Sequence, residues 1–431
     1  MKAGMFIALC LALAAPAAAA TRNVVAQDSN GITLAVLRGD APALQRIGKS
    51  ESVARLAGRA GYYRVRGDIA QSNRWADACI ADAAVLAEKN HGTLYLCRSL
   101  RAGNRLIEGD VAGWATDMLQ VRALYQHHVA PQLQPGEGVH ALTEPAFARF
   151  SHWPTSTTLQ APVTAGTRLA VSDRAGVPVA RGTLRDGRDG TRRAIESDFI
   201  VDTGATHSHL SRQAAQAMGL AVTEGFAVED AGTGHPVRIG LATPLDLEFN
   251  GIHFKDVAFT VTDTMPVNLI GLDLLRRLGP FVLRGGQLET LAALPAACQS
   301  PLSVTSGLWG EQYSLRLPMR IGKRDERVLL DTGSNGVLEA SGISLAGYPP
   351  QALVQTQRLT VHGMQPVRHA EATSPVTFNG ITATLPTRVN DQPARVFPVA
   401  WTLGYGLHDR YDYYLDVANA RGCLLPVPPP G

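Results

Sequence analysis

The stretch Phe199-Ile200-Val201-Asp202-Thr203-Gly204 decides the fold, because it recurs as Val328-Leu329-Leu330-Asp331-Thr332-Gly333, 129 residues further along the chain. In both copies, three apolar residues lead directly into Asp-Thr-Gly. A short apolar run that ends at turn residues predicts a buried strand. The glycine permits a sharp turn and the close approach of another backbone. The sequence therefore predicts two strands that each end in an aspartate.

The similarity of the two regions extends beyond these strands. Further motifs keep their order at nearly the same offset: Pro236–Arg238 with Pro366–Arg368, Phe249–Ile252 with Phe378–Ile381, and, more loosely, Leu269–Leu272 with Thr402–Tyr405. Such a series indicates two copies of one unit. Two copies in one chain can pack about a pseudo-two-fold axis, as the subunits of a homodimer pack about a true one.

Packing of this kind brings Asp202 and Asp331 together and gives them a chemical role. Two neighbouring carboxylates cannot both ionise easily, so they share one proton. The ionised member takes a proton from water, and the protonated member donates to a carbonyl oxygen. We therefore predict hydrolysis by a catalytic pair, Asp202 and Asp331, without a cofactor or metal. The alternative is that each aspartate only caps its own turn.

The surrounding motifs resemble those of the retropepsin-like (clan AA) aspartic peptidases, of the bacterial secreted type with two lobes in one chain. The resemblance covers roughly residues 160–431. It rests on four stretches: DFIVDTGATHSHLS at 198–211, VNLIGLDLLRRLG at 267–279, RVLLDTGSNGVLEA at 327–340 and WTLGYGLHDRY at 401–411. It implies a mainly β fold with two lobes, and an intramolecular catalytic pair. Most retropepsins form homodimers of one-lobed chains, whereas this chain carries both lobes, so we expect a monomer.

The resemblance also assigns roles to individual residues. The catalytic Asp, Thr and Gly of the family correspond to Asp202 and Asp331, with Thr203, Gly204, Thr332 and Gly333 supporting the turns. Two segments, Ala231–Val237 and Val361–Val367, resemble the hairpin flaps of the family. Such flaps close over an extended peptide and bind it like an added strand. Their candidate substrate-binding residues are Gly232, Thr233, Gly234, His362, Gly363 and Met364.

The region before the repeat has a different character. Residues 1–20 combine an early lysine, an apolar run and a small-residue end, which predicts a secretory signal peptide and a periplasmic or secreted protein. Apolar residues then recur at three-to-four spacing, so residues 21–150 are expected to form an α-helical domain of tetratricopeptide-like hairpins. Pro131–Pro145 is rich in proline and glycine and predicts a linker. Lobe 1 then occupies residues 151–300, and lobe 2 occupies residues 301–431.

Four cysteines remain after the signal peptide: Cys79, Cys97, Cys298 and Cys423. An even number in an oxidising compartment indicates two disulfides. Three pairings are possible. We favour Cys79–Cys97 within the helical domain and Cys298–Cys423 between the ends of the two lobes, with buried free thiols as the alternative.

The bulk composition narrows the choice of partners. The formal net charge is only +3 and no block of lysine or arginine stands out, which argues against nucleic acid. No later stretch is long and apolar enough to span a membrane.

The catalytic pair and the resemblance together predict an aspartic endopeptidase. The alternative is an inactive peptidase-like scaffold that binds a peptide or protein. The helical domain is either a docking surface for a protein partner or a removable prosegment.

Overall fold

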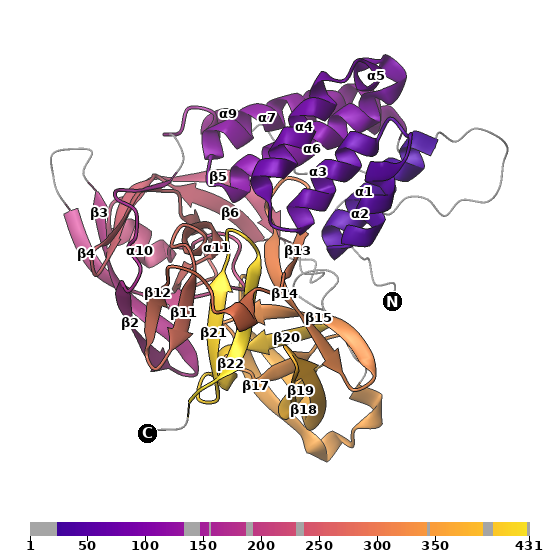
Figure 1. Ribbon diagram of the computed structural model, residues 1–431. Helices are drawn as coiled ribbons and strands as arrows, with labels where there is room; N and C mark the ends of the chain where they lie inside the picture. The colour runs from indigo at the N-terminus through magenta and orange to yellow at the C-terminus, as the bar shows by residue number, and fades with distance from the viewer. Residues whose placement is uncertain are drawn as a thin grey trace. The chain divides into compact units, whose positions relative to one another are not determined.

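The computed structural model describes residues 24–132, 147–154, 157–186, 193–229, 237–342, 345–390 and 400–428 (Figure 1). The predicted signal peptide, most of the predicted linker, and Gly232, Thr233 and Gly234 lie outside these residues. The chain packs into two compact units. One contains the helices before Ser156 together with Glu224–Arg238 and Thr305–Gln312. The other contains Thr157–Thr223, Ile239–Val304 and Tyr313–Gly431.

The helical unit is a series of neighbouring antiparallel hairpins in which each helix packs on the next (Figure 1). Its helices are α1 (Val24–Arg38), α2 (Ala41–Lys49), α3 (Arg55–Val65), α4 (Ile69–Ala81), α5 (Ala83–Leu86), α6 (His91–Ile107), α7 (Val111–Leu124) and α9 (Phe147–Phe150). The disulfide Cys79–Cys97 joins α4 to α6 inside the apolar core. In the part of the chain that the structure describes, no helix is both long and apolar enough to cross a membrane.

Three helices of this unit begin in the same way. The boundaries are Gly39-Asp40, Gly67-Asp68 and Gly109-Asp110, and the glycines have positive φ angles of 65°, 77° and 79°. Glycine adopts this conformation without steric cost, so it ends the preceding helix. Each aspartate accepts a hydrogen bond from the backbone N–H three residues later, at 3.0, 2.9 and 2.9 Å. The Gly-Asp pairs therefore both stop one helix and cap the next.

The segment Thr305–Gln312 completes the core of the helical unit. Arg64 of α3 is fully buried, and its guanidinium donates to the carbonyl oxygens of Gly307 and Leu308 at 2.9 and 3.0 Å. A buried charge is tolerable only when its hydrogen-bonding groups are satisfied. The helices and this distant segment therefore form a single packed structure.

The second unit contains a large sheet with strand order β1-β8-β7-β3-β2-β12-β11-β21-β22, and β4 pairs with β3 and β10. Its strands are β1 (Thr158–Leu159), β2 (Arg168–Arg174), β3 (Val177–Asp186), β4 (Arg193–Val201), β7 (Leu245–Phe249), β8 (Ile252–Val257), β10 (Asn268–Ile270), β11 (Phe281–Arg284), β12 (Gln287–Thr290), β21 (Tyr411–Asp416) and β22 (Arg421–Pro426). The last two come from the end of the chain and join through the pairing of β21 with β11. The disulfide Cys298–Cys423 fixes β22 to the segment after β12.

An eight-stranded sheet holds the second copy of the repeat, in the order β13-β14-β15-β20-β16-β19-β18-β17. Its strands are β13 (Ser303–Ser306), β14 (Tyr313–Ile321), β15 (Arg324–Asp331), β16 (Leu338–Ala340), β17 (Leu353–Thr360), β18 (Gly363–Phe378), β19 (Ile381–Asn390) and β20 (Trp401–Gly404). A third, small sheet contains β5 (Val222–Glu229), β6 (Val237–Ala242) and β9 (Thr260–Val261). The prediction of a mainly β chain with two β-rich lobes after a helical region is confirmed.

The two aspartates end equivalent strands. Strand β4 runs parallel to β10, with Val201 opposite Ile270, and β15 runs parallel to β20, with Leu330 opposite Leu403. Most of the apolar residues before the two aspartates are buried, and Ile200 alone among the six is partly accessible. Each Asp-Thr-Gly turn is therefore held at the end of a buried strand that a parallel neighbour supports.

Candidate active site

The two Asp-Thr-Gly turns are joined by reciprocal hydrogen bonds. The backbone N–H of Thr203 donates to the Thr332 hydroxyl at 3.0 Å, and the N–H of Thr332 donates to the Thr203 hydroxyl at 3.1 Å. Each hydroxyl in turn donates across to the other strand, Thr203 to the Leu330 carbonyl at 3.0 Å and Thr332 to the Val201 carbonyl at 2.6 Å. Both side chains are buried. This threonine interlock fixes the two turns against each other.

The interlock places each carboxyl group against the opposite turn. A Cβ atom added to Gly204 would lie 2.5 Å from Cγ of Asp331, and one added to Gly333 would lie 2.5 Å from Cγ of Asp202. Both positions therefore require glycine. The N–H of Gly204 also donates to Oδ1 of Asp202 at 2.8 Å, which orients that carboxyl group. Asp331 is buried, whereas Asp202 is partly accessible.

A second glycine closes each turn from the neighbouring strand. Gly271 has φ −93° and ψ −175°, and Gly404 has nearly the same angles, −97° and −177°. Each begins a short helix, α11 (Leu272–Leu275) and η7 (Tyr405–Leu407). The first N–H of α11 donates to the Ala205 carbonyl at 2.9 Å, and that of η7 donates to the Ser334 carbonyl at 2.8 Å. The loosely similar segments Leu269–Leu272 and Thr402–Tyr405 are therefore structurally equivalent.

Different polar residues support the two turns from outside. In lobe 1, the Asp273 carboxylate accepts from both the N–H and the hydroxyl of Ser208, at 2.9 and 2.7 Å. In lobe 2, the Ser334 hydroxyl donates to Glu339 at 3.1 Å, and Glu339 forms a buried ion pair with Arg358. The sequence assigned no supporting role to these residues, because their pairing depends on tertiary contacts.

The strands β17 and β18, labelled in Figure 1, pair as an antiparallel hairpin. Its two-residue tip is Val361-His362, followed by Gly363 with a φ of 83°. The Thr264 hydroxyl of lobe 1 donates to the Val361 carbonyl, so the tip reaches the other lobe. His362 and Gly363 therefore lie at the tip of a hairpin, and Met364 follows them as an exposed side chain.

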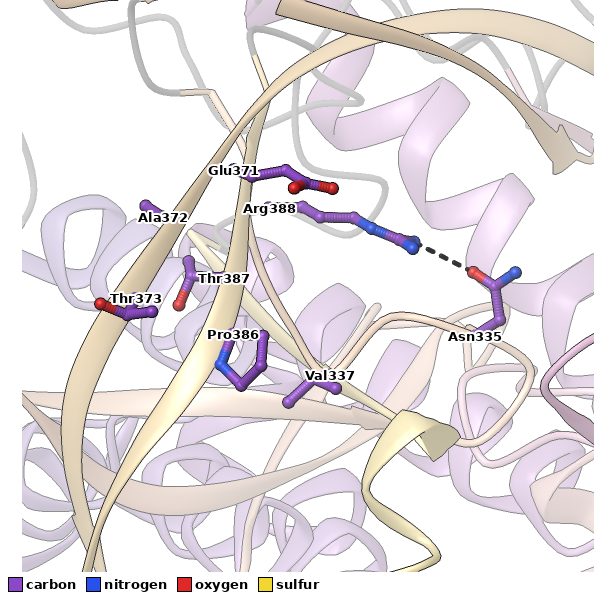
Figure 2. Close-up of a pocket in the computed structure, with 8 residues that line it drawn as sticks. All are labelled: Asn335, Val337, Glu371, Ala372, Thr373, Pro386, Thr387 and Arg388. Carbon is purple, nitrogen blue, oxygen red and sulfur yellow. Dashed lines mark hydrogen bonds between the residues drawn. The ribbon is translucent and has the colours of Figure 1, made fainter. Parts of the chain in front are cut away.

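A pocket of about 310 Å³, here called the hairpin pocket, lies between this hairpin and the lobe 2 turn. Its lining includes Ile200, Gly333, Ser334, Met364, Val367 and Arg388. An adjoining pocket of about 550 Å³, drawn in Figure 2, shares Asn335 and Arg388 with it. The hairpin pocket thus connects the turn that carries Asp331 with the hairpin that the sequence singled out.

His209 lies close to the lobe 1 turn but is part of the core. Its ring Nδ1 is 3.2 Å from the Thr260 hydroxyl. Burial lowers the pKa of His209 to about 4, so the imidazole is uncharged at neutral pH. These properties indicate a packing role.

The structure brings six of the predicted site residues into one cluster: Asp202, Thr203, Gly204, Asp331, Thr332 and Gly333. It contains the two disulfides favoured in the sequence, Cys79–Cys97 and Cys298–Cys423. Sequence reasoning missed the outer supports and the polar residues of the hairpin pocket. Asn335 and Glu339 follow the second motif closely, and that proximity was the only available signal.

A family of known proteins matches the part of the chain that carries the first turn. Residues 194–277, which include the first turn and its closing glycine, match the family described as "gag-polyprotein putative aspartyl protease". No protein of curated function matches the chain in sequence. The resemblance to retropepsin-like aspartic peptidases is therefore confirmed for this part of the chain.

The solved structures that are similar to the chain include an aspartic proteinase and two 7S globulins. An aspartic proteinase from Irpex lacteus is 12% identical, with a TM-score of 0.39, and the match covers 61% of this chain and 97% of that one. Basic 7S globulin from soybean is 12% identical, with a TM-score of 0.34 and coverages of 61% and 96%. Conglutin gamma, a basic 7S globulin from lupine seeds, is 10% identical, with a TM-score of 0.33 and coverages of 60% and 94%.

Proposed function

We propose that the protein is an aspartic endopeptidase in which Asp202 and Asp331 activate one water molecule. The observation that carries this proposal is the threonine interlock between the two turns. It holds each carboxyl group beside the glycine of the opposite turn. An arrangement fixed in this way needs no rearrangement before the reaction, which lowers the activation barrier.

The proposed reaction follows from two carboxyl groups that hold one proton. The ionised group removes a proton from a water molecule, and that water attacks the carbonyl carbon of the peptide bond. The protonated group donates to the carbonyl oxygen as negative charge develops there. A proton then passes to the leaving amine, so the bond is cleaved without a covalent enzyme intermediate. Gly204 contributes by orienting Asp202 through its N–H.

The hairpin of β17 and β18 supports an extended peptide as the substrate. Strand β17 is the last strand in its sheet, and its edge can pair with a substrate main chain. Met364 and Val367 supply apolar surface between this hairpin and the lobe 2 turn. Gly232, Thr233 and Gly234 stay predicted residues of a second flap.

The remaining predictions belong to the same proposal. Two disulfides favour an oxidising location, periplasmic or secreted, after removal of residues 1–20. Since one chain supplies both aspartates, we propose a monomer that needs neither cofactor nor metal. The division into residues 21–150, 151–300 and 301–431 and the role of the helical domain in binding a protein partner also stay predictions.

The test is proteolysis by the purified mature chain with Asp202→Asn or Asp331→Asn. Each change removes an acid–base group, so the cleavage rate should fall by about a thousandfold or more. Asp325→Asn is the matched control, since that aspartate is exposed on the same lobe. Circular dichroism would establish that the variants remain folded.

Binding of a statine-type transition-state mimic separates the enzyme from an inactive scaffold. Affinity that depends on both aspartates, together with cleavage, supports the enzyme. If either single variant kept the full cleavage rate, the shared catalytic pair would be wrong. Peptide binding without any cleavage would favour the scaffold.

A further inference from the structure

Arg388 of β19 places a guanidinium group at the polar end of the hairpin pocket. The side chain is partly buried, and its Nη1 donates to Oδ1 of Asn335 at 3.2 Å (Figure 2). Within the described ranges, Arg388 forms no ion pair. An arginine has five N–H donors, so one such bond leaves most of them for a ligand.

Asn335 fixes the position of this arginine relative to the catalytic turn. It lies four residues after Asp331, and its Nδ2 donates to the Ala175 carbonyl at 3.3 Å. The same amide therefore uses its nitrogen toward the backbone and its oxygen toward Arg388. This arrangement holds the guanidinium at a defined distance from the lobe 2 turn.

The other charges of the pocket are already compensated. Glu339 is engaged by Arg358 and by the Ser334 hydroxyl. His369 is buried, and burial, followed by the positive charge of Arg388, lowers its pKa, so it is uncharged at neutral pH. Among the described residues that line the hairpin pocket, Arg388 therefore carries the one charge without an ion pair.

Glu371 is the nearest competitor for this charge. It lies directly opposite Arg388 in the pairing of β18 with β19 and lines the adjoining pocket drawn in Figure 2. Its side chain is exposed and forms no ion pair with Arg388 in this structure. An ion pair between exposed side chains would contribute little free energy. A ligand carboxylate in a partly buried pocket can therefore bind Arg388 in place of Glu371.

The pocket also has apolar lining residues. Ile200, Leu359 and Val367 line it together with Gly333. A side chain that fits such a pocket has an apolar stem and an anionic end, as glutamate does. Arginine recognises carboxylates with paired N–H donors in its planar group.

We infer that Arg388 makes this peptidase selective for an acidic side chain, glutamate above all, at the substrate position that occupies the hairpin pocket. The inference rests on the proposed function. Arg388 binds the carboxylate, Asn335 positions Arg388, and Asp202 and Asp331 cleave the peptide held beside them. No bond of the acidic side chain itself is broken.

The test begins with the unaltered protein and a mixed peptide library, with cleavage sites read by mass spectrometry. One position near the cleaved bond should be enriched in glutamate. Matched peptides with Glu or Gln at that position should then differ in kcat/KM by about tenfold, as expected for one charge-assisted hydrogen-bonded pair.

Variants of Arg388 assign the selectivity to this residue. In Arg388→Gln the Glu-to-Gln ratio of kcat/KM should fall to about one, and in Arg388→Glu the preference should shift toward lysine at the same position. Arg320→Gln is the matched control, because Arg320 is exposed on β14 of the same sheet and should keep the wild-type ratio.

The outcomes separate this inference from the proposed function. Cleavage that depends on both aspartates but shows no preference for glutamate over glutamine would overturn the inference alone. A preference for glutamate that survives in Arg388→Gln would overturn it as well. Absence of any aspartate-dependent cleavage would instead overturn the proposed function.

Discussion

The two catalytic turns share the same interior but have different surroundings. Inside, Thr203 and Thr332 exchange equivalent hydrogen bonds, and Gly271 and Gly404 close the turns with nearly identical backbone angles. Outside, lobe 1 uses Asp273, whereas the equivalent position of lobe 2 is Gly406. The N–H of Gly406 donates to the Gly336 carbonyl at 3.1 Å. The N–H of Asp273 makes the corresponding bond to the Thr206 carbonyl at 3.2 Å, so the lobes share this backbone contact and differ in the side-chain carboxylate.

This difference connects the lobe 2 turn to the substrate side of the protein. In lobe 1, the Asp273 carboxylate accepts hydrogen bonds from Ser208, which lies next to the turn. In lobe 2, the Ser334 hydroxyl donates to Glu339, and Glu339 forms an ion pair with Arg358, which belongs to the β17–β18 hairpin. The comparison indicates that the interior of the turns sets the catalytic geometry, and that the exterior of lobe 2 adjusts substrate binding.

Among changes that leave both aspartates in place, the largest effect is expected from the two glycines that face the opposite carboxyl groups. In Gly204→Ala or Gly333→Ala, the new methyl group overlaps the carboxyl group of the other lobe. A displacement of about 1 Å at a reacting group lowers the rate by about a hundredfold. Both variants should lose kcat to a similar extent in a peptide cleavage assay.

The control for these two variants needs a glycine at which an added methyl group causes neither overlap nor backbone strain. Gly380→Ala does not meet this requirement, because the positive φ of Gly380 would strain an alanine. Gly92→Ala is the better control, since a Cβ added to Gly92 would meet no neighbouring atom and Gly92 lies in the helix α6. If only one catalytic glycine were sensitive, the equivalence of the two turns would be wrong.

The next effect concerns the threonine interlock. Thr203→Val or Thr332→Val keeps the shape of the side chain but leaves a buried N–H and a buried carbonyl without a partner. The free energy of unfolding should fall by about 2–4 kcal/mol in either variant. Urea denaturation measures this loss.

Thr382→Val provides the control, because Thr382 is exposed on β19 and should change stability by less than about 0.5 kcal/mol. Non-additive losses in the double variant Thr203→Val/Thr332→Val are also expected, since the two hydroxyls form one network. Additive losses would contradict reciprocal support.

The smallest effects are expected from the polar groups that support the two turns from outside, Arg358 with Glu339 in lobe 2 and Asp273 in lobe 1. Arg358→Lys keeps the charge but loses the guanidinium Nη2 that donates to Glu339, so the hairpin is held less firmly. We expect KM to rise roughly fivefold, about 1 kcal/mol. Asp273→Asn should instead lower the free energy of unfolding by about 1 kcal/mol. Steady-state kinetics and denaturation of both variants measure the contrast, and an equal rise of KM in both would remove the proposed difference.

Much of the site could be predicted from the sequence because the repeat is local. Three apolar residues before Asp-Thr-Gly identify each strand and turn, and the Gly-Asp pairs identify the helix boundaries in the first unit. The hairpin after Leu353 was only partly visible, since its tip lies at Val361-His362 but its strands extend from Leu353 to Phe378. Long-range contacts such as that of Arg358 with Glu339 left no sequence pattern.

Local sequence patterns were sufficient to locate the two Asp-Thr-Gly turns, the cysteines that form the two disulfides, and the change from helices to strands. These features depend on local conformational preference and on periodic burial, which neighbouring residues encode. The tertiary structure alone decided that Thr305–Gln312 packs with the helices, that β21 and β22 join the sheet of β11, and that Arg388 lies beside the lobe 2 turn. These features depend on contacts between residues far apart in the chain, and no local pattern specifies such partners.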